Sequence, residues 1–171
     1  MRLNRSNVTL EEVKAALDYN PDTGIFVWKW RSDVPPKVNG RDAGQEAGSM
    51  VGAYREIHFN GRKCLSHILA WFYMTGNWPE RFIDHKDQNK TNNKWDNLRL
   101  ATKGQNSMNR GVQPNNKLGF RGVCESFGKY EALVAMNGKK VFRRRFDTVE
   151  EAVYWRDYAV QYHHKEFASA A

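Results

Sequence analysis

Residues 83–110 read IDHKDQNKTNNKWDNLRLATKGQNSMNR, and this stretch predicts how the middle of the chain folds. Short apolar runs lie on both sides of an Asn-rich segment, and Asn favours turns because its side chain hydrogen-bonds to nearby backbone groups. Thr102 and Gln105 have the spacing of a capping box, which predicts that a helix begins at Lys103. The expected unit is therefore strand, turn, strand, helix.

The polar residues of this unit resemble those of the HNH nuclease family, in the branch formed by phage homing endonucleases. That family has a ββα fold around one divalent metal ion. Here Asp84 and His85 are adjacent, and Asn97 and Asn106 follow His85 by 12 and 21 residues. The resemblance implies that Asp84 and Asn106 bind the metal, that His85 is the general base, and that Asn97 is a catalytic residue that orients His85.

Elementary chemistry supports these residue types. Histidine is the side chain whose ordinary pKa lies near neutrality, so His85 can take a proton from water. Carboxylate and amide oxygens are hard ligands, which suits Mg²⁺, with Mn²⁺ as an alternative. Adjacent residues of a strand point to opposite faces. We therefore expect either a bulge at Asp84-His85 or a base that approaches the phosphate from the side away from the metal.

The composition favours a folded protein with a polyanionic partner. The chain has 171 residues, a formal net charge of +8, a pI near 9.6 and 13% aromatic residues, which excludes a disordered basic tail. Cys64 and Cys124 form no Cys-x-x-Cys pair, so we expect neither a disulfide framework nor a zinc site. No signal peptide or long apolar span is recognisable. We therefore expect no membrane association and an intracellular protein, by the resemblance in the cytoplasm of a phage-infected bacterium.

The N-terminal region is expected to support the catalytic unit. A capping box at Thr9 and the helical spacing of apolar residues predict a helix that ends at Asn20, and residues 25–30 predict a strand. Residues 31–48 are rich in Pro, Gly and charge, and Pro35-Pro36 predicts a loop without regular structure. This loop is either a solvated connector or a DNA contact. The candidate contacts are Arg31, Lys37 and Arg41.

The segment before the Asp-His pair predicts a hairpin and a buried helix. Asn60-Gly61 lies between two strand-like runs, residues 54–59 and 63–65, which is typical of a tight primed turn. The run that starts at Ser66 or His67 is apolar on most sides, so it predicts a buried helix that ends at Gly76. For His67 itself, a buried structural role is favoured over a contact with DNA phosphate.

After a linker, the chain changes character. Three strand-like runs, residues 119–123, 130–136 and 140–146, precede a capping box at Thr148 and a helix. Residues 119–164 resemble the APETALA-type DNA-binding domain of plant ethylene-response factors, in which a three-stranded sheet lies in the major groove and a helix packs on its back. The resemblance implies DNA contacts by Arg121, Lys129, Tyr130, Lys140, Arg143 and Arg145. The alternative for the last strand is a basic edge that discourages aggregation.

We expect an α+β chain of four parts. They are an N-terminal α/β support region (residues 1–63), an HNH ββα-metal catalytic unit (64–112), a linker (113–118) and an APETALA-type domain (119–171), whose three-stranded antiparallel sheet packs on one helix. The expected activity is metal-dependent, site-specific cleavage of double-stranded DNA by a homing-type endonuclease, leaving a 5′-phosphate and a 3′-hydroxyl. One site per chain predicts nicking by a monomer or weak dimer on DNA, with no obligate protein partner. The alternatives are a non-catalytic DNA-binding regulator and a structure-specific or RNA nuclease.

Overall fold

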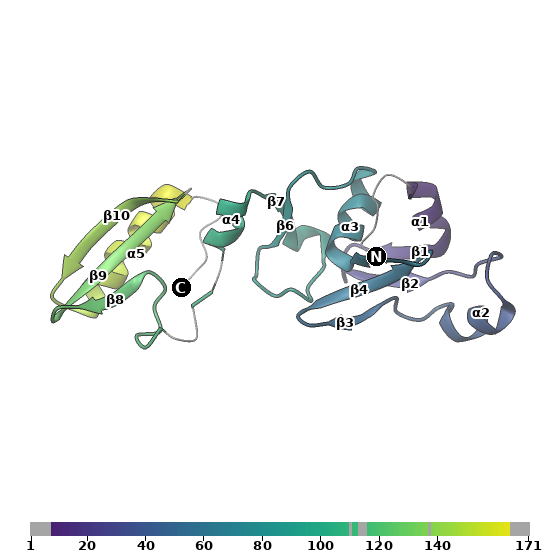
Figure 1. The fold of residues 1–171 in the computed structure, drawn as a ribbon, viewed down its shortest axis with the longest axis horizontal. Helices are drawn as coiled ribbons and strands as arrows, with labels where there is room; N and C mark the ends of the chain where they lie inside the picture. Colours follow the sequence, from purple (N-terminus) through teal and green to yellow (C-terminus); the bar gives the residue numbers. More distant parts are fainter. Residues whose placement is uncertain (1–7, 110, 113–115, 137, 165–171) are drawn as a thin grey trace. The chain divides into compact units, whose positions relative to one another are not determined.

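The computed structural model describes residues 8–109, 111–112, 116–136 and 138–164 (Figure 1). Its helices and small sheets of two or three strands form a mixed α+β chain, as expected. By compactness the chain divides into two units, residues 1–100 and 101–171. The boundaries of the four expected parts stay a prediction.

The first unit begins with a helix that passes directly into a strand. Helix α1 (Leu10–Ala16) is capped by Thr9, whose hydroxyl accepts from the Glu12 amide, while the Glu12 carboxylate accepts from the Thr9 amide. Strand β1 (Leu17–Asn20) follows at once and pairs antiparallel with β2 (Ile25–Trp28). The expectation of a helix through the end of β1 is therefore wrong, because pairing with β2 outweighs the weak local preference for helix.

A second helix lies in the segment that was expected to be an irregular loop. Helix α2 spans Pro36–Asp42 and has proline in its first turn. Proline is tolerated there because the first N–H groups of a helix have no intrahelical partner. The expectation of no regular structure is therefore wrong. The buried Asn39 ties the helix back to the preceding chain, since its side-chain oxygen accepts from the backbone amide of Arg31 at 2.9 Å.

A three-stranded antiparallel sheet of order β3–β4–β5 follows. Its strands are β3 (Ser49–Val51), β4 (Tyr54–Phe59) and β5 (Arg62–Leu65). The turn between β4 and β5 has positive φ at Asn60 (49°) and Gly61 (70°), as a primed hairpin turn requires. The predicted hairpin is confirmed, and β3 is an additional strand that the sequence did not indicate.

Helix α3 (Ser66–Thr75) follows β5 without a loop and ends at Gly76, whose φ of 73° is left-handed. It contacts α1 and the β4–β5 hairpin and buries Leu69 and Phe72 in the core of this unit. Burying one such side chain contributes roughly 1.5–3 kcal/mol. The predicted buried helix is confirmed, and its first turn carries His67 into the core.

The segment that contains Asp84, His85 and Asn97 folds largely as expected. Strands β6 (Phe82–His85) and β7 (Leu98–Ala101) pair with each other, and a short 3₁₀ turn, η2 (Trp95–Asn97), leads into β7. The amide of Lys86 donates to the carbonyl of Asn97 at 2.9 Å and closes the base of the turn. The predicted strand, turn and strand are confirmed.

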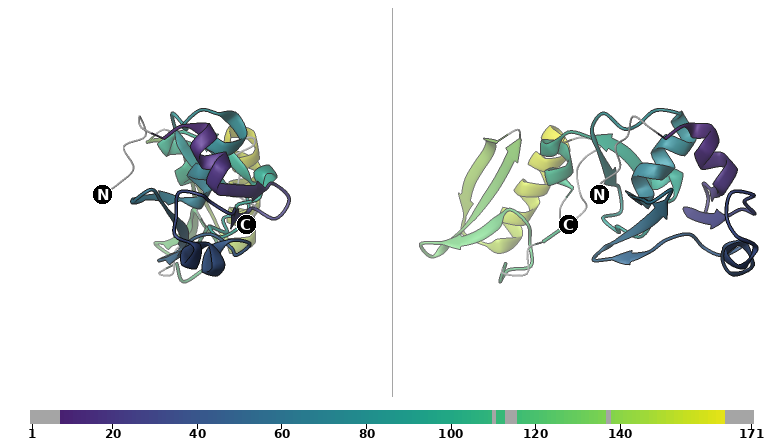
Figure 2. Two further views of the ribbon diagram at one scale, coloured as in Figure 1. Left: turned by 90° about the vertical axis from the view of Figure 1, so that its right-hand side faces the viewer. Right: turned by 45° about the vertical axis from the view of Figure 1, so that its right-hand side comes forward.

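The second unit contains the helix that follows β7 and a sheet with one covering helix (Figure 2). Helix α4 (Lys103–Met108) begins with the predicted capping box between Thr102 and Gln105. The sheet has the order β10–β9–β8, and α5 packs against it. The bounds are Val123–Ser126 for β8, Lys129–Met136 for β9, Lys139–Phe146 for β10 and Val149–His164 for α5.

Strand β8 begins later than expected. The prediction of a strand over residues 119–123 is wrong up to Gly122, whose φ of 73° belongs to a turn. A Cβ at this position would lie 2.6 Å from the carbonyl oxygen of Leu133, and the Gly122 carbonyl accepts from the Leu133 amide at 2.7 Å. Glycine is therefore required where the turn meets β9.

The sheet of the second unit has two different faces. One face packs against α5 through a cluster that includes Ala132, Phe146 and Ala152. In β10 the register shifts by one residue between Lys140 and Phe142, so that Lys140 lies opposite Ala135 and Arg143 opposite Leu133. Such a bulge re-aims side chains. It places Lys140 and Arg143 on the same face, away from α5.

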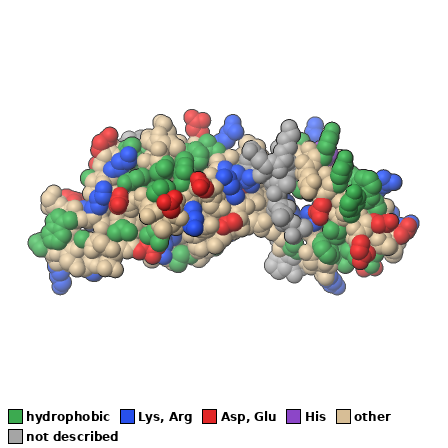
Figure 3. All heavy atoms as spheres, turned by 180° about the vertical axis from the view of Figure 1, so that it is seen from behind, with side chains coloured by type: hydrophobic (Ala, Val, Ile, Leu, Met, Phe, Trp, Pro, Cys, Tyr) green, Lys and Arg blue, Asp and Glu red, His purple; other side chains and the backbone are tan. Residues whose placement is uncertain are grey.

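Across the described residues, no helix is both long enough and apolar enough to cross a membrane. On the face of the molecule drawn in Figure 3, Lys and Arg side chains are interspersed with Asp and Glu side chains. The basic excess is therefore not gathered into one block on that face.

Candidate active site

His85, the last residue of β6, is buried with only 5% of its surface exposed. Its Nε2 atom lies 3.0 Å from Oδ1 of Asn93, which is itself 3% exposed. Because an amide oxygen only accepts hydrogen bonds, this contact places the imidazole proton on Nε2. In the neutral ring the lone pair is then on Nδ1, which is the nitrogen that can accept a proton.

Asn93 is held by the N-terminal hairpin. The Tyr19 hydroxyl of β1 donates to the Asn93 carbonyl at 2.7 Å, and burial raises the pKa of that phenol. Gly24, between β1 and β2, has a φ of 74°, and a Cβ there would lie 2.3 Å from the carbonyl carbon of Asn93. The amide of Trp95 donates to the carbonyl of Pro21 at 2.9 Å. The β1–β2 hairpin thus fixes the residue that orients His85.

Asn97 holds the turn and does not contact the His85 ring. Its side-chain nitrogen donates to Oδ1 of Asp87 at 2.9 Å and to the Asn92 carbonyl at 2.8 Å, and its oxygen accepts from the Asp87 amide at 3.1 Å. Burial works against ionisation of Asp87, but the hydrogen bonds from Asn92 and Asn97 lower its pKa below the ordinary value. The expected orienting contact to His85 is thus made by Asn93. The catalytic role expected for Asn97 stays a prediction, and it would act through the turn.

Asp84 faces a different neighbour from His85. Its Oδ2 accepts from both Nε and Nη2 of Arg99 on β7, each at 2.9 Å, and Asp84 is 4% exposed. Separate surroundings for two adjacent strand residues fit the expectation that a base approaches from the side away from the metal. A carboxylate has about four acceptor sites, so the arginine and a cation can share it.

An aromatic cluster surrounds His85 on the side of α3. The ring of His67 is 5.0 Å from that of His85 at 76°, and the ring of Tyr54 is 5.3 Å from His67. The ammonium of Lys90 lies 5.1 Å from the Tyr54 ring. Burial, and after it the charge of a protonated His85, lower the pKa of His67 to about 3. His67 is therefore neutral near pH 7, and it is buried as expected, in contact with the His85 ring. Its structural role stays a prediction.

Asn106 lies on α4, in the second unit, and is half-buried. Its amide donates to the carbonyl of Thr102, so the capping box sets the first turn of this helix. A buried carboxylate at Asp84 and an amide at Asn106 are the donor types that Mg²⁺ and Mn²⁺ take, so these residues fit the expected cation. That they meet at one ion stays a prediction.

The expected DNA contacts of the second unit lie in different places. Arg143 and Arg145 share the face away from α5 with Glu131, to which they pair at 3.0 and 3.3 Å. Lys140 is exposed on the same face. Lys129 pairs with Asp147 at 2.7 Å.

Two other expected DNA contacts are engaged elsewhere. Tyr130 packs into the cluster covered by α5, so it does not lie on the face of Arg143. The guanidinium of Arg121 donates to the carbonyls of Ser107 and Met108, at the end of α4. Its geometry favours a role in holding α4 over a contact with DNA.

The three basic residues around α2 are on or near the surface. Lys37 is exposed, whereas the Arg31 guanidinium lies 4.8 Å from the Trp28 ring. Arg41 forms a two-pronged pair with Asp42 at 2.6 and 2.9 Å, which raises the arginine pKa and lowers that of the carboxyl. Arg31 contacts an aromatic ring and Arg41 forms an ion pair, so the exposed Lys37 is the best candidate of the three for a contact with DNA phosphate.

Sequence reasoning did not assign Asn93 and Tyr54 to the site, and it gave His67 no contact with His85. In the sequence, Asn93 is one of several turn-forming asparagines and Tyr54 is part of a strand-like run. Their proximity to His85 depends on the packing of the hairpin and α3, for which the local sequence carries no signal.

Comparison with known proteins gives a family match and two relatives. Residues 64–108 match the family model described as HNH endonuclease. The chain is 37% identical over 93 residues to an uncharacterized HNH endonuclease of Acanthamoeba polyphaga mimivirus, and the match covers 54% of this chain and 48% of the relative. It is 33% identical over 104 residues to Protein 3.8 of Escherichia phage T7, covering 59% of this chain and 84% of that protein. The chain thus spans about half the length of the mimivirus relative. No solved structure matches it.

Proposed function

This chain belongs to the HNH endonuclease family, and on that premise we propose that it is a metal-dependent, site-specific DNA endonuclease of the homing type. The proposed substrate is double-stranded DNA, nicked by one chain at a time in a phage-infected cell. The observation that carries the proposal is the buried His85, whose Nε2 is bonded to Asn93 and whose Nδ1 therefore holds the lone pair.

In the proposed mechanism His85 Nδ1 takes a proton from a water molecule next to the scissile phosphate. Asn93 keeps the imidazole in the required tautomer and stabilises the imidazolium, because its Oδ1 accepts from Nε2–H in both protonation states. The neutral His67 ring and the Tyr54 ring limit solvent at the other side of the imidazole. The resulting hydroxide attacks phosphorus, and the bond to the 3′ oxygen breaks. This oxygen takes a proton from solvent, so the products are a 5′-phosphate and a 3′-hydroxyl.

Nucleases of this family generally use a divalent metal, and Asp84 and Asn106 are the residues that would hold it here. When bound, such an ion supplies positive charge for the phosphate oxygens as negative charge grows on them. Arg99 keeps the Asp84 carboxylate in place. We propose Mg²⁺, with Mn²⁺ as the substitute, because both favour oxygen ligands.

DNA recognition is proposed for the second unit. Its three-stranded sheet with one covering helix has the order of elements of the APETALA-type domain, which supports that resemblance. Arg143, Arg145 and Lys140 lie on the face that α5 leaves uncovered, and they would supply phosphate contacts.

The direct test is cleavage of supercoiled plasmid by the purified protein with Mg²⁺, followed by sequencing of the ends. Wild-type protein should nick the plasmid, and His85→Ala should lower the rate by about 10²–10⁴-fold, the usual contribution of a general base. His58→Ala is the matched control, because His58 is exposed and pairs with Glu56 away from this site. Wild-type protein that binds DNA and never cuts it would instead support a non-catalytic regulator, and preference for branched DNA or RNA would change the substrate.

A further inference from the structure

Helix α5 packs one side against the sheet of the second unit and leaves its other side exposed. Ala152 and Ala159 lie on the packed side and are buried. The exposed side carries four large aromatic residues, and between 38% and 70% of the surface of each is accessible to solvent. Together they form the aromatic face of α5, which consists of Tyr154, Trp155, Tyr158 and Tyr162.

The spacing of these residues puts them on one side of the helix. Residues four apart are neighbours on a helix surface, and Tyr154, Tyr158 and Tyr162 follow one another at this interval. Trp155 lies beside this row, since its ring centre is 5.6 Å from that of Tyr154 and 5.8 Å from that of Tyr158. Both pairs meet edge to face, so the rings cover less of each other than stacked rings do. The aromatic face therefore offers a continuous area for contact with a partner.

The size of the aromatic face indicates what kind of partner it can hold. With roughly 200 Å² for each aromatic side chain, the exposed fractions leave an accessible surface of roughly 450 Å². Exposed patches of roughly 300–600 Å² are often functional. A stable complex of two folded proteins buries about 800 Å² on each partner. The aromatic face thus suits a short segment of a partner better than a second folded copy of this chain.

The carboxylates on the exposed side of α5 give this surface a negative charge. Glu150 and Glu151 are exposed in the first turn, and Glu151 lies one turn before Trp155, so the two side chains are neighbours. Among the described residues, the ion pairs at this end of the second unit are formed by Asp147 and Asp157 instead. Acidic residues in a first turn also stabilise the helix dipole, but that role does not require aromatic neighbours.

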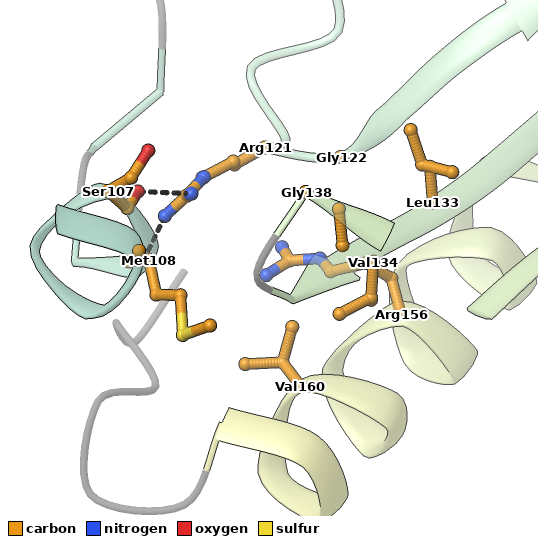
Figure 4. A pocket seen from close by; sticks show the side chains of 11 residues that line it. Ser107, Met108, Arg121, Gly122, Leu133, Val134, Gly138, Arg156 and Val160 are labelled. Atoms are coloured by element: carbon orange, nitrogen blue, oxygen red, sulfur yellow. Dashed lines mark hydrogen bonds between the residues drawn. The ribbon is translucent and has the colours of Figure 1, made fainter. Parts of the chain in front are cut away.

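The one arginine of α5 does not offset this charge on the exposed side, and the helix contains no lysine. Arg156 is buried, and Figure 4 shows its side chain beside Val134 of β9, on the side of the helix that faces the sheet. A Cβ at Gly122, in the turn before β8, would lie 3.6 Å from Cγ of Arg156. The exposed side of α5 is thus acidic and aromatic in a chain whose net charge is +8.

This combination favours a cationic partner over a nucleic acid. Surfaces that stack nucleic-acid bases combine aromatic rings with Lys or Arg, whereas carboxylates repel phosphate groups. A guanidinium group can lie flat on an aromatic ring and also form two parallel hydrogen bonds with a carboxylate. The chain contains one such stacking contact of its own, because the Arg31 guanidinium lies 4.8 Å from the Trp28 ring.

We propose that the aromatic face of α5, with Glu150 and Glu151 beside it, docks an arginine-rich segment of another protein. The rings of Tyr154 and Tyr158 contact the planes of the guanidinium groups, and the carboxylates pair with their edges. The docked segment lies on the side of α5 that faces away from the sheet. If the sheet binds DNA as proposed, one unit can hold DNA and this segment at the same time.

The first test needs no variant. The full chain, without DNA or metal, is titrated with a peptide that alternates Arg and Gly, and the indole ¹⁵N–¹H signals are followed by NMR. The signal of Trp155 should shift in a saturable way, whereas that of Trp30, an exposed tryptophan of the first unit, should not. A peptide with Lys in place of Arg carries the same charge and should bind about threefold more weakly or worse, because an ammonium stacks less well on a ring.

The second test compares variants by the fluorescence anisotropy of a labelled Arg-Gly peptide. Tyr158→Ala should weaken binding about tenfold, because Tyr158 is at the centre of the aromatic face. Trp30→Ala is its control, since it removes an exposed aromatic side chain elsewhere. Glu151→Gln should weaken binding and reduce its salt dependence. Glu11→Gln is the matched control, because Glu11 is also an exposed glutamate in the first turn of a helix.

Several results would overturn the proposal. They are the absence of a saturable shift at Trp155 with the Arg-Gly peptide, and equal affinities of Tyr158→Ala and wild type for it. A Trp155 signal that shifts with protein concentration alone, together with dimers in sedimentation, would assign the aromatic face to a second copy of the chain. A shift with duplex DNA and none with the peptide would assign it to nucleic acid. Neither test measures DNA cleavage, so failure of the proposed nuclease activity would leave both results unchanged.

Discussion

At His85, one hydrogen bond decides which ring nitrogen can act as a base. Asn93 Oδ1 accepts from Nε2, and the Asn93 backbone is in turn held by Tyr19 and by close packing against Gly24. A neutral imidazole without this partner would exchange between its two tautomers and rotate more freely. The orientation of the proposed base therefore depends on Asn93 and on the N-terminal hairpin that holds it.

Replacing Asn93 with Ala tests this dependence. The cleavage rate at saturating DNA should fall about tenfold or more, because part of the His85 population would carry its proton on the wrong nitrogen. DNA affinity should stay unchanged. Single-turnover cleavage and equilibrium binding measure the two quantities. Asn89→Ala is the control, since Asn89 is exposed and bonds only within the turn; equal rates for Asn93→Ala and wild type would contradict the assignment.

His67 makes stability depend on pH in a defined direction. Its pKa is about 3 in the folded protein and near 6.5 when unfolded. Between these values the unfolded state binds more protons, so the free energy of unfolding falls as the pH is lowered from about 6.5 towards 3. Each pKa unit corresponds to about 1.4 kcal/mol.

Replacing His67 with Gln should reduce this loss of stability in acid. Urea unfolding at neutral and at acidic pH measures the difference, and the stability of His67→Gln should change less between the two conditions than that of wild type. His58→Gln serves as control, because His58 is exposed. If both variants retained the wild-type pH dependence, the acid sensitivity would come from other groups.

At the scale of elements, α4 is a six-residue helix that is too short to be stable by itself. Three features support it: the capping box at Thr102, the packing of Met108 with Ala101 and Met136, and the hydrogen bonds from Arg121 to its last carbonyls. A cation at this end also complements the helix dipole. The helix that carries Asn106 is therefore held by residues that follow it in the second unit.

Arg121→Ala should loosen α4 without weakening DNA binding. Loss of two hydrogen bonds from a charged donor, about 1.5–3 kcal/mol each, should speed hydrogen exchange of the α4 amides about tenfold or more. Hydrogen exchange followed by NMR measures this. Arg143→Ala should show the reverse pattern, with normal exchange in α4 and weaker DNA binding. Weaker DNA binding by Arg121→Ala with unchanged exchange would restore Arg121 as a DNA contact.

At the scale of the whole molecule, the net charge of +8 predicts salt-dependent binding to a polyanion. The charge is not all available, because Glu131 pairs with Arg143 and Arg145 on the uncovered sheet face. Glu131 is also the carboxylate that approaching DNA phosphates would meet on this face. The sheet is thus partly neutralised before it binds.

Glu131→Gln should therefore bind duplex DNA more tightly and with a steeper dependence on salt. Each additional phosphate contact changes the slope of log K against log salt concentration by about −0.9. Fluorescence anisotropy over a range of salt concentrations gives the slope. Glu125→Gln is the control, because it removes the same charge from the neighbouring strand β8. Glu125 lies opposite Tyr130 and so on the other face of the sheet. If the salt-dependence slope of Glu131→Gln equalled that of Glu125→Gln, DNA would not bind at the sheet face that carries Glu131.

Elements whose signals are local could be predicted from the amino-acid sequence. The capping boxes at Thr9 and Thr102, the Asn60-Gly61 turn and the β6–β7 hairpin depend on hydrogen bonds between residues close in the chain, and the structure has them where they were predicted. The motif Asp84-His85 was also visible, because its spacing to later residues is a property of the chain alone.

The residues that surround the motif could not be predicted, because they come together through long-range packing. The Asn93 side chain lies against His85 because the Tyr19 hydroxyl, 74 residues away in the chain, holds the Asn93 carbonyl. His67 lies on α3, and its ring contacts that of His85. The Arg121 side chain donates to α4 and does not point into solvent. These contacts join parts of the chain that carry no local signal for each other, since their energy comes from burial and from satisfying buried polar groups after the chain has folded.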